Sequence, residues 1–216
     1  MIDFKIPDET KAIRDKVRNF VQSECHPAEE NCTAENFDEV LAGLRKIARS
    51  QGLWCPFVPE EHGGMGLRPL ANALVQMELG ESFLGALALN TQGPDDATML
   101  TLLEHGTDFQ KEKFLKPLLN GEKRICYSMT EKAAGADATG MQTKAELDGD
   151  EWVLNGEKWF SSSASVADIA VVMAKTDPDA ARHEQDSTFI VELPNPGYNI
   201  LRNIETMQPH TELGLK

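Results

Sequence analysis

The first half of the chain repeats apolar residues at intervals of three and four, a spacing that places them on one side of an α-helix. Two amphipathic stripes are formed by Ile13, Val17, Phe20 and Val21, and by Phe37, Val40, Leu41, Leu44, Ile47 and Ala48. The run from Leu70 to Leu89 is more apolar and predicts a buried helix, in which Gly80 and Gly85 allow either close helix contact or a break. Two further helices are predicted over Asp96–Glu104 and Asp108–Leu119, the second with Thr107 as its N-cap.

After Gly121 the pattern changes to short alternating or apolar runs of strand length. These runs are Ile125–Met129, Thr143–Leu147, Trp152–Leu154, Lys158–Ser161, Ile169–Ala174, Thr188–Leu193 and Tyr198–Leu201. Asp148-Gly149-Asp150 and Asn155-Gly156 indicate tight turns, and Thr176–Gln185 has the polar composition of a hairpin loop. The pattern therefore predicts an α+β protein, with an all-helical domain over residues 1–121 and an antiparallel β-barrel-like domain over residues 122–216.

Composition narrows the classes of function. With 216 residues, 41% of them hydrophobic, the chain can bury a true core. Its net charge of -14 argues against a nucleic-acid surface, which needs clustered Lys and Arg. The cysteines Cys25, Cys32, Cys55 and Cys126 form no CxxC pair and the five histidines are scattered, so no metal site is expected. The first residues lack the apolar run of a signal peptide or membrane span, and we expect a soluble, cytoplasmic protein.

The segment from Tyr127 to Thr176 carries the most chemistry. It joins a hydroxyl-bearing strand to a loop of small residues, and its second half brings Trp159 and Phe160 next to a run of serines. An aromatic side chain beside hydroxyl donors suits a flat ligand with polar edges, such as a flavin. The glycine-rich stretch His62–Gly66 is more typical of a turn than of a phosphate loop, because no strand precedes it and the Gly-Lys-Ser/Thr ending is missing.

Several motifs in order along nearly the whole chain resemble the flavin-dependent acyl-CoA dehydrogenase family. They are Gly52-Leu53-Trp54, Pro59–Gly66, Gly106–Leu119, Met129-Thr130-Glu131, Gly135-Ala136-Asp137, Asn155-Gly156-Glu157-Lys158 and Ala167-Asp168. The family has an N-terminal helical domain, a middle β domain and a C-terminal four-helix domain, and this chain is similar to the first two. The resemblance implies an oxidoreductase of fatty acid metabolism that binds FAD and an acyl-CoA, uses an electron acceptor and assembles as a homo-oligomer.

The resemblance also implies positions for a flavin. The strand matching Tyr127, Met129 and Thr130 lies along the pyrimidine edge in the family, where fixed donors favour the reduced ring. Phe160 matches the aromatic residue on the flavin face, and Ser162, with Ser161 beside it, matches the hydroxyl near N5. Strand alternation over Lys158–Ser161 favours Phe160 over Trp159 as the residue facing the ring, and Trp159 is the alternative if the register slips by one.

The loop Lys132–Asp137 reads KAAGAD, where the family usually has Pro-Gly-Ala-Gly-Ser-Asp. Gly135 would permit the close backbone approach that a phosphate of FAD or CoA needs. Ala136, assigned to both cofactor and substrate contact, replaces a serine and removes one hydroxyl donor. Lys132 adds a cation that partly compensates for that loss.

No catalytic residue is assigned, because the family's general base, a glutamate, lies in the C-terminal helical domain. The stretch 211–216 is expected to end an incomplete β domain before its last strands. Two hypotheses follow: a truncated acyl-CoA dehydrogenase, or a non-catalytic half subunit that binds flavin or a separate C-terminal partner. An oxidase or monooxygenase on the same fold is a third, which no residue here distinguishes from the first.

Overall fold

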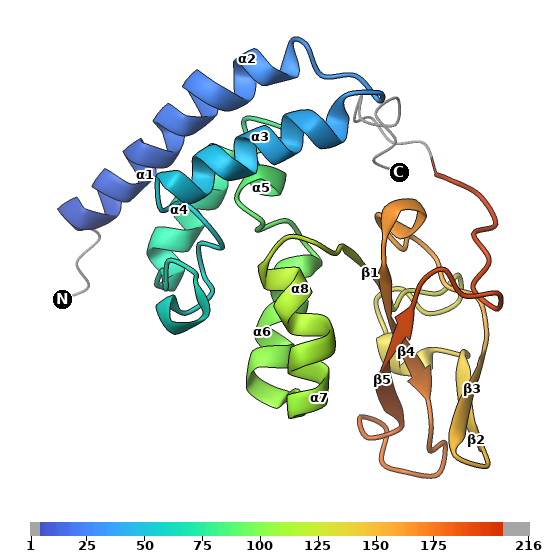
Figure 1. The fold of residues 1–216 in the computed structure, drawn as a ribbon. Helices are drawn as coiled ribbons and strands as arrows, with labels where there is room; N and C mark the ends of the chain where they lie inside the picture. The colour runs from blue at the N-terminus through green and yellow to red at the C-terminus, as the bar shows by residue number, and fades with distance from the viewer. Residues whose placement is uncertain (1–4, 205–216) are drawn as a thin grey trace. The chain divides into compact units, whose positions relative to one another are not determined.

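The structure, a computed structural model, describes residues 5–204 and divides into two compact units between Glu122 and Lys123 (Figure 1). The stretch 211–216, where the sequence predicts an incomplete β domain to end, lies outside the described residues. The first unit is helical and the second contains a sheet, so the fold is α+β.

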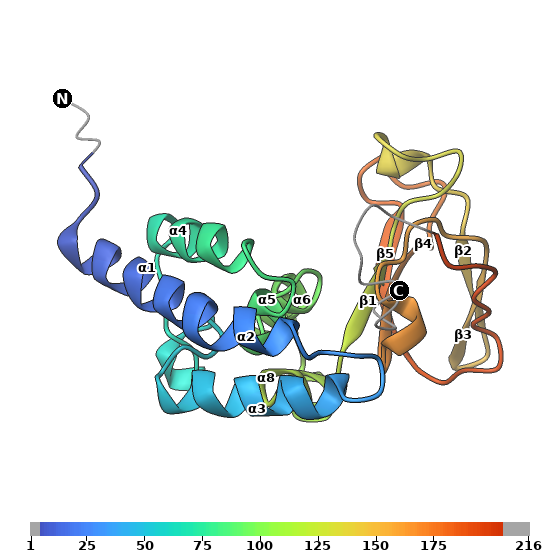
Figure 2. The ribbon, with the colours of Figure 1, turned by 90° about the horizontal axis from the view of Figure 1, so that it is seen from above.

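The helices of the first unit follow the periodic stripes. They are α1 (Asp8–Phe20), α2 (His26–Glu29), α3 (Phe37–Ser50), α4 (Pro69–Leu79), α5 (Gly85–Ala88), α6 (Asp95–His105), α7 (Asp108–Gln110) and α8 (Lys116–Leu119). Single π-helical turns join α1 to α2 and α7 to α8, and Figure 2 shows α1 and α2 as one continuous rod. Pro27 and Pro117 lie just inside α2 and α8. Because proline has no N–H for the α-helical bond, each helix widens at this point.

Helix α4 packs on α1 through apolar residues and one ion pair. Val17 and Phe20 of α1 and Val75 and Leu79 of α4 are buried. Arg18 reaches across and donates two hydrogen bonds to the buried carboxylate of Glu78, at 2.7 and 2.9 Å. The paired guanidinium compensates the Glu78 charge, which explains a carboxylate inside an otherwise apolar interface.

The expected helix over Leu70–Leu89 is two helices. It breaks at Gly80 and resumes at Gly85, where the chain passes so close to α4 that an added Cβ at Gly85 would lie 2.6 Å from the carbonyl oxygen of Leu79. Of the two roles expected for these glycines, close helix contact or a break, the structure shows the break. Thr107 is confirmed as an N-cap: its hydroxyl accepts from the Gln110 N–H at 3.2 Å, and the Gln110 side chain accepts from the Thr107 N–H at 2.9 Å.

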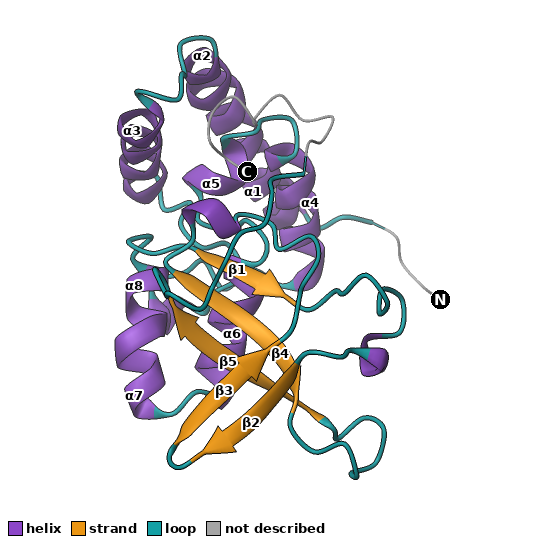
Figure 3. Ribbon diagram, turned by 90° about the vertical axis from the view of Figure 1, so that its right-hand side faces the viewer, coloured by secondary structure: helices purple, strands orange, loops and turns teal. Residues whose placement is uncertain are grey.

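The second unit contains a mixed sheet, which corrects the antiparallel barrel expected from the sequence (Figure 3). Its strands are β1 (Ile125–Ser128), β2 (Lys144–Asp148), β3 (Glu151–Asn155), β4 (Ile169–Lys175) and β5 (Asp186–Glu192). On one side of β4, β5 pairs antiparallel along the whole strand. On the other side, β1 pairs parallel with its first half and β2 pairs parallel at its end, and β3 forms an antiparallel hairpin with β2.

The parallel pairs have a simple cause. Turn signals in the sequence fix the direction of a hairpin, and they fix it correctly for β2–β3 and for β4–β5, whose loop is the predicted polar stretch 176–185. The partner of β1, however, is reached only through residues 129–168, and a connection of that length permits a parallel return. The sheet is not closed among the described strands.

Two predicted strands, Lys158–Ser161 and Tyr198–Leu201, are irregular in the structure. Gly156 packs directly on Thr143, where an added Cβ would lie 2.3 Å from the hydroxyl oxygen, and Phe160 has a φ of 58°, outside extended geometry. Tyr198 follows a turn in which its N–H donates to the carbonyl of Asn195 at 3.0 Å. Strand alternation therefore cannot decide between Trp159 and Phe160.

Candidate functional site

The end of β1 and the segment 159–162 lie side by side in the second unit. The N–H of Trp159 donates to the carbonyl oxygen of Thr130 at 2.7 Å, and the hydroxyls of Ser128 and Ser161 are 2.8 Å apart. One main-chain and one side-chain hydrogen bond thus join the two segments that sequence analysis assigned to one ligand. They bring Thr130 next to the pair Trp159-Phe160.

The two aromatic residues have different surroundings. Phe160 is 63% exposed, whereas Trp159 is half-buried and has the guanidinium of Arg202 at 5.1 Å from its ring centroid. Their rings meet edge to face, with centroids 5.5 Å apart and an interplanar angle of 82°. Phe160 is therefore the aromatic side chain of this pair that is open to a ligand, and Trp159 serves the packing around it.

The two serines that follow, Ser161 and Ser162, also have different surroundings. Ser161 belongs to a partly buried polar group. Its partner Ser128 lies 3.4 Å from the hydroxyl of Tyr198, which in turn lies 3.5 Å from the thiol of Cys126. Burial raises the pKa of the Tyr198 phenol, and its contact with Cys126 adds to the rise. Ser162, in contrast, is exposed. No role for Tyr198 follows from the sequence, since nothing local links it to β1.

A buried ion pair fixes the start of the loop that follows β1. The carboxylate of Glu131 pairs with Lys158 at 2.8 Å and accepts from the N–H groups of Gln142 at 2.6 Å and Thr143 at 2.9 Å. Lys158 also donates to the carbonyl of Met129 at 3.0 Å, so the pair ties the loop, the strand end and the segment 156–160 together. Glu131 is a structural acceptor in this arrangement.

The electrostatics of Glu131 match that role. Burial alone would raise the pKa of its carboxyl, but Lys158 and the donors at Thr143 and Gln142 outweigh burial and lower the pKa from 4.5 to about 2. The group is a fixed anion at physiological pH. A general base works best when its pKa lies near the working pH, so a carboxylate with a pKa of about 2 is poorly suited to accept a proton at physiological pH.

The loop between Glu131 and the 3-10 turn Ala138–Gly140 is open to solvent. Glu131 and Ala134 exchange two main-chain hydrogen bonds of 3.1 Å, and Gly135, Ala136 and Asp137 are exposed. An added Cβ at Gly135 would meet nothing within 4 Å. The fold itself therefore does not require glycine there, which leaves close approach of a ligand as a reason for it. No hydrogen bond within residues 5–204 joins Gly135 or Ala136 to Phe160.

Two hydroxyls around Phe160 are available to a ligand. Thr130 and Ser162 make no side-chain hydrogen bond to any residue in the described range 5–204, although both have neighbours that do. The Thr130 side chain is partly buried, but its hydroxyl oxygen is not among the buried polar atoms that lack a partner in the described residues, so it remains accessible to a ligand. Beside an exposed aromatic ring, these two donors fit the polar edge of a flat heteroaromatic group.

Other kinds of site find less support in the described part of the chain. Among residues 5–204, no group of three or more His, Cys, Asp or Glu side chains is arranged to hold a metal ion. No helix in the same range has both the length and the apolar character needed to span a membrane.

Comparison with known proteins identifies the family. Residues 7–122 match the model of the acyl-CoA dehydrogenase N-terminal domain, and residues 126–215 match that of the acyl-CoA dehydrogenase middle domain. The chain therefore belongs to the acyl-CoA dehydrogenase family, as the sequence motifs indicate.

Individual relatives agree with this assignment. The chain is 37% identical over 202 residues to acyl-CoA dehydrogenase family member 11 of Gallus gallus, a match covering 87% of this chain and 26% of that protein. A putative acyl-CoA dehydrogenase from Mycobacterium abscessus superposes with a TM-score of 0.88 at 31% identity, over 98% of this chain and 56% of that one. An acyl-CoA dehydrogenase complexed with FAD from Bacillus anthracis gives 0.71 at 31% identity, over 96% and 35%. The chain thus spans about half or less of these relatives.

Proposed function

We propose that this chain forms the flavin-binding part of an FAD-dependent acyl-CoA dehydrogenase, an oxidoreductase that removes two hydrogens from an acyl-CoA thioester. The observation that carries the proposal is the hydrogen bond between Trp159 N–H and the Thr130 carbonyl, because it joins the two segments assigned to the flavin edge. The Bacillus anthracis relative, which was solved with FAD, supports the same cofactor.

The residues present fit a flavin in three respects. Phe160 offers an exposed ring to its face, and the hydroxyls of Thr130 and Ser162 offer donors to its edge. Tyr127 in β1 and Met129 just after it flank Ser128, whose hydroxyl lies 2.8 Å from that of Ser161. At the loop, Gly135 and Ala136 present main chain that is open to a phosphate group.

When bound, FAD would accept a hydride from the β-carbon of the acyl chain, while a carboxylate removes the α-proton. The residues of this chain would hold the ring in place for that transfer: Phe160 covers one face, and Thr130 and Ser162 donate to positions where negative charge increases. Glu131 is already committed to Lys158, so we assign no base within the described residues. In this proposal the base comes from a further C-terminal domain or from a partner chain.

Binding of FAD to Thr130 variants tests the proposal directly. FAD is titrated into the 216-residue chain and followed by quenching of flavin fluorescence, with Thr130→Val and Thr130→Ser alongside. Loss of one hydrogen bond should weaken binding about two- to tenfold in Thr130→Val, whereas Thr130→Ser, which keeps the hydroxyl, should bind like the wild type.

The opposite results are equally clear. A chain that binds no FAD, either alone or together with a C-terminal domain, would contradict a flavoprotein. A chain that binds FAD but never bleaches with an acyl-CoA when completed by such a domain would instead favour the non-catalytic half subunit.

A further inference from the structure

The exposed loop 132–137 lies between two anchors in the second unit. The first anchor is the Glu131–Lys158 pair at its start. The second is Thr139, in the 3-10 turn Ala138–Gly140 at its end. Within the loop Ala134 is buried and exchanges two main-chain hydrogen bonds with Glu131, whereas Lys132, Ala133, Gly135 and Ala136 are exposed. Packing therefore contributes little beyond Ala134, and the two anchors determine the position of the exposed residues.

Thr139 closes a ring of hydrogen bonds with Asp137 and Arg182. Arg182 Nε donates to the Thr139 hydroxyl at 2.8 Å, that hydroxyl donates to Asp137 Oδ1 at 2.6 Å, and Arg182 Nη2 pairs with Asp137 Oδ2. A hydroxyl has one proton to donate and can also accept, so Thr139 can make both of these hydrogen bonds at the same time. We call these three residues the Thr139 latch.

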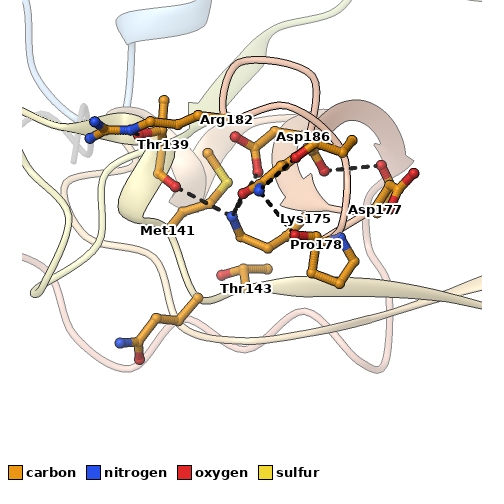
Figure 4. Close-up of polar contacts among 12 residues, drawn as sticks. Thr139, Met141, Thr143, Lys175, Asp177, Pro178, Arg182 and Asp186 are labelled. Carbon is orange, nitrogen blue, oxygen red and sulfur yellow. Dashed lines mark hydrogen bonds and ion pairs between the residues drawn. The ribbon is translucent and has the colours of Figure 1, made fainter.

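Arg182 comes from a different part of the sequence, the hairpin loop 176–185 between β4 and β5. That loop is itself ordered: Gln185 donates to the carbonyls of Pro178 at 3.0 Å and Ala180 at 3.1 Å. Lys175, at the base of the hairpin, donates to Gln185 at 2.6 Å and to the main-chain oxygen of Thr139 at 3.3 Å. Figure 4 shows the main-chain oxygen of Thr139 joined to Lys175 and the Arg182 side chain beside Thr139.

The charge of Arg182 is already matched by Asp137. A guanidinium that is paired in a bidentate ring is oriented by its partner and is not presented as a free counter-charge. The contact therefore acts on the loop, not on a ligand directly. A lysine would not reproduce its geometry, because an ammonium lacks the planar fork in which Nε and Nη2 point side by side at Thr139 and Asp137.

We propose that Arg182 is a positioning residue, which through the Thr139 latch fixes loop 132–137 in the conformation that receives a phosphate group of FAD or CoA. The identity of the ligand rests on the proposed function. The positioning effect rests on the hydrogen bonds of the Thr139 latch. It gives the β4–β5 hairpin a role in binding although the hairpin supplies no ligand contact.

The test combines amide exchange with ligand binding in the full chain. Arg182→Met removes every donor at similar length, and Thr139→Val removes the hydroxyl at similar volume. Both should raise exchange at the Thr139 and Gly140 amides and weaken binding of FAD or of coenzyme A, each about two- to tenfold. Thr139→Ser keeps the hydroxyl, and His183→Ala changes an exposed neighbour in the same hairpin. Both controls should stay at the wild-type values.

Two results would overturn the inference: unchanged amide exchange in Arg182→Met, or faster exchange with undiminished affinity for both ligands. The second would leave the latch as a structural contact without a role in binding. Failure of the proposed function is a different result, namely a wild-type chain that binds no FAD. Arg182→Lys is an intermediate variant, because it keeps the charge and loses the planar fork. Its amide exchange rate should lie between those of the wild type and Arg182→Met.

Discussion

Trp159 and Phe160 are adjacent in the sequence but should respond differently to truncation. Phe160→Ala removes an exposed ring, so it should cost at most about 1 kcal/mol of unfolding free energy while weakening FAD binding about tenfold through lost stacking. Trp159→Ala removes a half-buried ring with the Arg202 guanidinium over it and should cost about 2 kcal/mol. Urea unfolding and FAD titration of both variants measure the contrast. A greater loss of FAD in Trp159→Ala, at conditions where it remains folded, would assign the flavin face to Trp159.

Glu131 gives a prediction about pH. Its pKa is about 2 in the folded protein against an ordinary 4.5, so the carboxylate stabilises the fold fully above pH 4.5, and that contribution is lost as the pH falls toward 2. Glu131→Gln should therefore cost about 1–3 kcal/mol at pH 7. The difference from wild type should shrink as the pH is lowered through this window.

Urea unfolding of both proteins at several pH values measures this dependence. Glu146→Gln, at an exposed position of β2, is the matched control and should show no such loss. A Glu131→Gln deficit that is constant from pH 7 to pH 3 would show that packing, and not charge, explains the cost.

Single residues also show where sequence reasoning stops. Thr130, Phe160 and Ser162 were predicted from motif order, and the structure brings their two segments into hydrogen-bonding contact. Their contact with flavin stays a prediction. Tyr198 and Arg182 were not assigned, because their partners Ser128 and Thr139 are far away in the sequence and no local pattern records such a pairing.

At the scale of elements, two glycines in the helical unit should behave in opposite ways. Gly43 lies inside α3 with nothing within 4 Å of an added Cβ, so Gly43→Ala should stabilise the protein by about 0.5–1 kcal/mol. Gly85 begins α5 against the Leu79 carbonyl, so Gly85→Ala must shift main chain and should cost more than about 1 kcal/mol. Thermal unfolding of both variants gives the sign of each change. Stabilisation by Gly85→Ala would contradict the close approach of the two helices.

Helices were easier to predict than strands for a physical reason. A helix satisfies its own backbone hydrogen bonds, so its limits depend on local spacing and caps, as at Thr107. A strand needs a partner, and the short run of β1 indicates a strand but not which other strand lies beside it. The parallel pairing of β1 with β4 therefore appeared only in the fold.

At the scale of the whole molecule, the order of the two units is the informative feature. A helical unit followed by a unit with a mixed sheet matches the N-terminal and middle domains of the acyl-CoA dehydrogenase family, in that order. The chain spans 26% of the Gallus gallus relative and 56% of the Mycobacterium abscessus structure. A complete active site is therefore proposed only for this chain together with further polypeptide.

The sequence by itself determined the helical stripes, the two hairpins and the family, because periodicity, turn chemistry and ordered motifs are written in neighbouring residues. The segments that would face a flavin stay a prediction from the sequence. Only the tertiary structure decided the parallel strand pairs, the irregular path that exposes Phe160, and the Thr139 latch from the β4–β5 hairpin. Each of these depends on contacts between residues that are distant in sequence and come together only in the folded chain. Local spacing in the sequence does not specify such contacts.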